Sequence, residues 1–191
     1  MKTFFLLVTL ISLASCSPKN PDTQTAPPTE TTPASQTKSF DNVDPAVKQQ
    51  FAQFLNDYFA LNQALINDNF DNAKQAAINF AQTASKFEVA KLDGEQLDYY
   101  YMHSSNLKMA LGNLGASPDI EKARTELATV SDEMYALVKA FHPNDTPLYY
   151  QYCPMARNNK GATWISLKKE LENPYMGQMM LACGRTQETI N

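Results

Sequence analysis

The stretch DPAVKQQFAQFLNDYFALNQALIN, residues 44–67, decides the fold class. Asp44 suits the N-cap of a helix and Pro45 suits its first helical position, because the proline ring fixes φ and the missing N–H has no partner there anyway. Apolar side chains then recur at helical spacing to the end of the stretch. We therefore predict an amphipathic helix that ends at Asn67.

The same apolar period recurs three more times further along the chain. It predicts helices over residues 69–92, 95–114 and 118–141, and breaking residues such as Asp93-Gly94 separate them. Four helices of roughly 20 residues joined by short turns favour an all-α fold, an antiparallel four-helix bundle over residues 44–143.

A Cys/Met-rich extension of loop and short helix is expected to follow the bundle, over residues 144–191. Residues 148–152 are predicted to form a short extended segment. Residues 162–167, around Trp164, are predicted to form an ordered loop or a short strand.

A short helix is predicted over residues 174–183, because Asn173-Pro174 is a suitable N-cap and first helical residue and Gly184 a suitable stop. Gly177 inside this segment costs about 1 kcal/mol relative to alanine. That cost suggests that another group approaches the chain closely at this glycine.

The first residues are predicted to form an export signal. Lys2 precedes an apolar run over residues 4–13, which is too short to span a bilayer as a helix. Leu13-Ala14-Ser15-Cys16 resembles the lipobox of bacterial lipoproteins. We expect removal of residues 1–15 and lipidation of Cys16, which would anchor the protein to a membrane.

Residues 16–40 are expected to form a disordered tether, since they are rich in Pro and Thr and have few apolar side chains. The anchor places the protein in the cell envelope. Ser17 follows the lipidated cysteine, which by the enterobacterial sorting rule favours the outer membrane, facing the periplasm.

One folded domain is expected over residues 41–191, a length that can bury its own core. The whole chain has a net charge of −4 and no basic block, so nucleic acid is a poor candidate partner. We found no phosphate-binding loop, nucleophile elbow or zinc-peptidase motif, and we expect no enzymatic activity.

Two cysteines remain after Cys16, and their roles are open. In an oxidising compartment Cys153 and Cys183 could form a disulfide. They could equally serve as ligands of a soft metal ion. Zinc is less favoured, because a third and fourth ligand would have to include His103 or His142, and neither has the spacing of a zinc motif.

Sulfur is concentrated in the extension. On a helix, Met176, Met180 and Cys183 would share one face. Thiolates and thioethers are the ligands that Cu(I) prefers, and Ag(I) resembles it. The candidate metal ligands are Cys153, Met155, Met176, Met179, Met180, Cys183 and His103. The alternative is that these methionines only fill the core around a disulfide.

Several segments resemble the DUF3347 family, a family of unknown function. In the extension they are YCPMA at 152–156, Trp164, NPYMG at 173–177 and MLACG at 180–184. Upstream, YFALNQALIND at 58–68 and the stretch 124–137 resemble the helical part of the family. The resemblance implies a helical exported domain of Bacteroidetes, which is also found fused to adaptor subunits of heavy-metal efflux pumps of the CusB type.

Two functions are therefore expected from the sequence. The first is a lipid-anchored periplasmic protein that binds or delivers Cu(I) or Ag(I) and is linked to heavy-metal efflux, with an efflux adaptor or another envelope protein as partner. The alternative is a non-catalytic interaction module, closed by a Cys153–Cys183 disulfide, which docks on an envelope or efflux complex.

Overall fold

The structure is a computed structural model that describes residues 38–191. The predicted signal, Cys16 and the tether as far as residue 37 lie outside the described residues. The folded part begins slightly earlier than predicted, because Phe40 is buried and its backbone N–H donates to the Ala140 carbonyl. The Phe40 ring packs against Phe141, with 5.2 Å between ring centroids.

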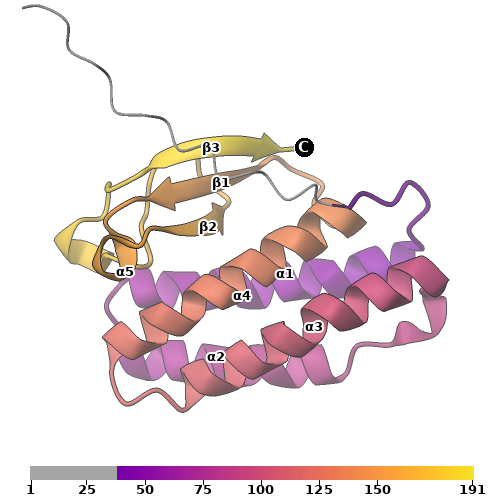
Figure 1. Ribbon diagram of the computed structural model, residues 1–191, viewed down its shortest axis with the longest axis horizontal. Coiled ribbons are helices and arrows are strands. Elements are labelled where there is room, and N and C mark those ends of the chain that lie inside the picture. The colour runs from indigo at the N-terminus through magenta and orange to yellow at the C-terminus, as the bar shows by residue number, and fades with distance from the viewer. Residues whose placement is uncertain (1–37) are drawn as a thin grey trace, which may run out of the picture. The chain divides into compact units, whose positions relative to one another are not determined.

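Residues 38–191 are mostly helical and end in a small antiparallel sheet (Figure 1). The long helices are α1 (Pro45–Ile66), α2 (Phe70–Ser85), α3 (Gly94–Gly115) and α4 (Ile120–Phe141). Their number and approximate positions confirm the predicted helices. Among residues 38–191, we find no helix with the length and hydropathy of a membrane span.

Each long helix begins at a side chain that accepts a hydrogen bond from a backbone N–H of the first turn. The N-cap residues are Asp44, Asn69, Asp93 and Asp119. These caps satisfy N–H groups that have no partner within the helix, which is why the helices begin where they do.

The second helix is shorter than predicted. α2 ends at Ser85, and only a short 3₁₀ helix, η1 (Val89–Lys91), follows within the predicted range. The reason is tertiary packing: Phe87 stacks on Tyr100 with ring centroids 4.2 Å apart. The chain leaves the helix so that this ring can join the core.

The prediction of an all-α fold was wrong for the extension, which contains a three-stranded sheet. β1 (Leu148–Cys153) is central and pairs antiparallel with both β2 (Ala162–Ser166) and β3 (Arg185–Ile190). β1 and β2 confirm the predicted extended segments. β3 was not predicted, because RTQETI is polar and largely exposed and shows no apolar alternation.

The predicted helix over residues 174–183 does not form. The chain makes turns there, with a single 3₁₀ turn, η2 (Gly177–Met179). Between β1 and β2 lies the short element α5 (Ala156–Asn159), in which Arg157 and Asn158 have φ of 55° and 57°. It is therefore a left-handed turn rather than a regular helix.

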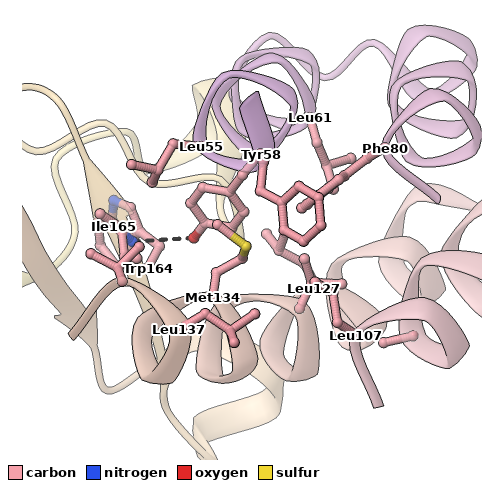
Figure 2. Packing of buried hydrophobic residues seen from close by; sticks show 14 of the residues in the cluster. Leu55, Tyr58, Leu61, Phe80, Leu107, Leu127, Met134, Leu137, Trp164 and Ile165 are labelled. Atoms are coloured by element: carbon pink, nitrogen blue, oxygen red, sulfur yellow. Dashed lines mark hydrogen bonds between the residues drawn. The ribbon is translucent and has the colours of Figure 1, made fainter. Parts of the chain in front are cut away.

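Helices and sheet share one core. Figure 1 shows the sheet over α1 and α4, with α2 and α3 on the opposite side of these helices. Figure 2 shows Tyr58 of α1 between the two layers, with Met134 of α4 and Trp164 and Ile165 of β2 around it. The Tyr58 hydroxyl accepts a hydrogen bond from the Ile165 backbone N–H at 3.1 Å. The core thus fixes the sheet on the helices.

Candidate metal centre

The two late cysteines lie together at one end of the sheet. Cys153 is the last residue of β1 and is fully buried, whereas Cys183 lies just before β3 and is partly exposed. Both are free thiols, and their Sγ atoms are 2.7 Å apart. The antiparallel register, with Tyr152 opposite Arg185, brings them together.

Gly184 makes this approach possible. Its φ is +140°, and a Cβ there would lie 2.7 Å from the Tyr152 carbonyl oxygen and 3.1 Å from the Trp164 ring. A side chain at this position would push the chain away from β1. Cys183 would then separate from Cys153.

Asn173 closes the loop that carries Cys183. This residue is completely buried. Its side-chain amide donates to the Cys183 carbonyl at 2.7 Å, and its side-chain oxygen accepts from the backbone N–H of Tyr175 at 2.8 Å. Its backbone N–H donates to the Leu181 carbonyl at 2.9 Å. These hydrogen bonds therefore hold together the two ends of the loop from residue 173 to residue 183.

Arg124 of α4 fixes the same loop from the other side. It is 7% exposed, and its Nε donates to the Pro174 carbonyl at 3.0 Å. Its Nη2 donates to the Leu65 carbonyl at 3.0 Å and to the Asp68 carboxylate at 2.5 Å. The guanidinium thus joins α4, the end of α1 and the loop. We call Arg124, Asp68 and the carbonyls of Leu65 and Pro174 the Arg124 clasp.

Asp68 completes the clasp from the end of α1. Its second carboxylate oxygen accepts from the backbone N–H of Gln178 at 3.1 Å. The hydrogen bond from Arg124 is the main reason why the pKa of Asp68 is lowered from its usual value. The carboxylate therefore stays charged at neutral pH and connects the guanidinium to the loop backbone.

Gly177 lies inside the clasp. Its φ is +56°, and a Cβ there would overlap the side chains of Asp68 and Arg124. The sequence predicted a close approach at this glycine, which is confirmed. The left-handed conformation also explains why the predicted helix fails, since it turns the chain out of the right-handed path one residue after Met176.

The predicted methionine ligands consequently do not share a helical face. Met176 is partly buried against the core. Met155, Met179 and Met180 are 46%, 79% and 36% exposed. Met180 is tied to the pair by its backbone, because its carbonyl accepts from the Cys183 N–H at 3.0 Å. Met155 follows Cys153 by two residues. Met179 is the methionine most open to solvent.

His103 contacts residues of α3 and α4 instead of the two cysteines. It lies on α3, where its Nδ1 is 2.5 Å from a carboxylate oxygen of Glu133 and its ring packs on Tyr99. His142 follows α4 and shares a hydrogen bond with Ser39, and burial lowers its pKa.

Within residues 38–191, we find no group of three or more His, Cys, Asp and Glu side chains placed to bind a metal ion. Besides the two cysteines, ligands for a site here would come from the thioethers.

The chemistry of the thiol pair is governed by their proximity. The hydrogen bond with Cys153 and burial raise the pKa of Cys183 to about 11. At neutral pH Cys183 is therefore protonated in the free protein. Any metal ion that binds its sulfur must displace that proton.

Sequence reasoning missed the residues that position the pair. Arg124 and Asp68 were not identified as important to this site, and Asn173 was predicted only as a helix N-cap, although all three fall in stretches that resemble the family. Their spacing in the chain carries no signal, because Arg124 and Asp68 are 56 residues apart. Apart from these stretches, the indication was Gly177, whose cost within a helix suggested a close approach.

The site thus consists of a dithiol on a small sheet that is fastened to a helical domain. Residues 54–146 match the family model described as a protein of unknown function, DUF3347, and the chain belongs to this family. The match runs from within α1 to the segment before β1 and ends before Cys153. No curated protein and no solved structure matches the chain.

Proposed function

We propose that this protein is a lipid-anchored envelope protein that binds a monovalent soft metal ion, Cu(I) or Ag(I), between Cys153 and Cys183. The observation that carries the proposal is the 2.7 Å distance between their Sγ atoms. Two thiols at one point, next to methionines, form the soft donor set that such ions prefer.

The metal would require a small opening of the pair. Two metal–sulfur bonds of about 2.3 Å, the length found for zinc, place the two sulfurs roughly 4 Å apart. Rotation of the Cys183 side chain between staggered positions would supply this separation. Cys183 is partly exposed and adjoins solvent, whereas Cys153 is buried. The ion would therefore arrive from the side of Cys183.

The helical part would act as the base of the site. We propose that it is an antiparallel four-helix bundle, because α1 contacts α2 and α4, and α3 contacts α2 and α4. Short connections between the helices support the same arrangement. A rigid base of this kind keeps ligands in position for binding. The protein would pass its ion to an efflux adaptor or another envelope protein and would perform no catalysis.

Titration of the reduced full chain in detergent with Cu(I), without oxygen and against a competing chelator, tests the proposal. We expect the Cys153→Ser/Cys183→Ser double variant to bind at least about 100-fold more weakly, because the two thiolates supply all the negative charge of the site. The double variant keeps Cys16, so it also controls for that thiol. Equal affinities would reject the metal site.

Methionine variants identify the remaining ligands. Met155→Leu and Met180→Leu should each weaken Cu(I) binding if that thioether completes the site, since leucine keeps the volume but has no sulfur. Met179→Leu is the matched control, because Met179 is 79% exposed and should leave the affinity unchanged.

The affinity should depend on pH in a distinctive way. The pKa of Cys183 is about 11, so binding displaces its proton at every pH below that value. We expect the apparent affinity to rise about tenfold per pH unit and to keep rising between about pH 8 and pH 10. An ordinary thiol would level off above about pH 8.5. Such a plateau would contradict the raised pKa of Cys183, which ultraviolet absorbance of the thiolate measures independently.

The second candidate function is a scaffold closed by a Cys153–Cys183 disulfide. The same short distance favours it, since a thiol oxidant of the envelope that takes up two electrons and two protons would join sulfurs that already meet. Intact mass of the protein from its native envelope, after thiol alkylation with and without reductant, separates the two functions. A pair that alkylates only after reduction favours the scaffold, because a disulfide offers no thiolate to the metal.

A further inference from the structure

The surface of α2 and α3 that faces away from the sheet is unusually poor in charge. No charged residue occurs between Gln75 and Ser85 of α2, and Lys108 is the only one between Tyr99 and Ala116 of α3. By contrast, α4 carries seven charged residues. Depletion of charge is typical of the buried centre of protein interfaces rather than of solvated helices.

Exposed apolar side chains gather on these two helices. Ile78 of α2 is 40% exposed, and Met102 and Met109 of α3 are 65% and 61% exposed. The two methionines are seven residues apart and so lie on the same side of the helix. We call this surface the α2/α3 face. It is made of exposed residues of α2 from 75 to 85 and of residues 101–116, which belong to α3 and its C-cap.

An apolar groove runs between the two helices on this face. Its volume is about 530 Å³, and its lining includes Ile78, Ala81, Gln82, Lys86, Leu111 and Gly112. Gly115 explains the close packing of the helices, because a Cβ there would lie 3.1 Å from Ile78. The base of the groove is therefore formed by a close contact between α2 and α3.

Gly112 has no such packing reason. It lies inside α3, where glycine costs about 1 kcal/mol relative to alanine. Yet a Cβ at this position would meet nothing within 4 Å. Packing within the fold therefore does not require glycine at this position. Glycine does keep the groove open, because any side chain at residue 112 would extend into the groove.

We propose that the α2/α3 face is the surface through which two copies of this chain associate. The face carries both a projecting part, Met109, and a recess, the groove at Gly112, one helical turn away. In a twofold dimer the same patch meets itself, so Met109 of each copy can enter the groove of the other. Methionine adapts readily to such a recess.

The low charge and the area of the α2/α3 face both suit association with a second copy of the chain. Two identical, strongly charged surfaces would repel each other, but this face carries only Lys108, with Lys86 in the lining of the groove, so the repulsion is small. The face is roughly 25–30 Å long and about 20 Å wide, from the rise of a helix and the spacing of two packed helices. That projection of roughly 500–600 Å² approaches the ~800 Å² per partner of a standard interface once surface relief is included.

Multi-angle light scattering on the full chain in detergent, over a range of protein concentrations, tests the proposal. We expect the wild type to have twice the mass of one chain at high concentration. Met109→Glu, which places a charge on the projecting side chain, and Gly112→Trp, which fills the groove, should each shift the protein to the monomer.

Met179→Glu is the matched control, because it introduces the same charge at an exposed methionine in the extension and should leave the dimer intact. Circular dichroism shows whether each variant keeps its helices. A wild type that stays monomeric at every concentration overturns the proposal, and so does a dimer that both folded variants retain. Neither result bears on metal binding, which uses the other side of the molecule.

Discussion

Replacing Arg124 by alanine is expected to lower the free energy of unfolding by about 3 kcal/mol. Arg124 is buried, and its guanidinium donates to the Pro174 and Leu65 carbonyls and to the Asp68 carboxylate. Without it, two carbonyl oxygens lose a charged donor in the interior. Urea unfolding followed by circular dichroism measures the loss, and fluorescence of Trp164 follows the sheet.

Two further substitutions separate hydrogen bonding from packing. Arg124→Met keeps most of the side-chain volume but has no donors, so we expect it to retain most of the destabilisation. Lys122→Ala, in the same helix, removes the ion pair between the exposed Lys122 side chain and Glu126 and should cost less than about 0.5 kcal/mol. If Arg124→Met were as stable as the wild type, the Arg124 clasp would contribute only packing.

Gly177→Ala is expected to lower the free energy of unfolding by about 2–3 kcal/mol. Two costs add: a left-handed φ of +56° at a residue with a Cβ, and displacement of the Asp68 and Arg124 side chains that the Cβ would overlap. The same urea unfolding experiment measures the loss.

Gly94→Ala is the matched control for this substitution. Gly94 begins α3, and a Cβ there meets nothing within 4 Å, so alanine should be neutral or slightly stabilising. In the Arg124→Ala background the cost of Gly177→Ala should fall, because part of the clash has been removed. Strictly additive losses would show that Gly177 and Arg124 do not interact.

Both predictions bear on the proposed metal site, because the clasp holds the loop that carries Cys183. Its links to Pro174 and to Gln178 lie at the start and middle of that loop. If the dithiol binds a metal ion, loosening the clasp should weaken binding without touching a ligand, since the two sulfurs would no longer be held in position.

The helices could be predicted from the sequence because their signals are local. In α1, hydrogen bonds run between residues four apart, so the apolar period and the Asp44-Pro45 start are sufficient. The boundary of α2 was the exception, and there a long-range contact of Phe87 with Tyr100 decided the outcome.

The candidate site could be predicted only in part. The sequence identified Cys153, Cys183 and their neighbouring methionines, but it left open whether the two thiols meet. It placed the methionines on a helix that does not form. Neither the β1–β3 register nor the bonds of Arg124 can be inferred from spacing, because each joins segments more than 30 residues apart in the chain.

The sequence by itself therefore determined the four long helices, the extended segments around Tyr150 and Trp164, and the family, since all of these depend on residues that are near one another in the chain. Only the tertiary structure decided the third strand, the turns around Gly177 and the meeting of Cys153 with Cys183. The physical reason is that strand pairing and a buried guanidinium depend on partners brought together by folding, which no local pattern records.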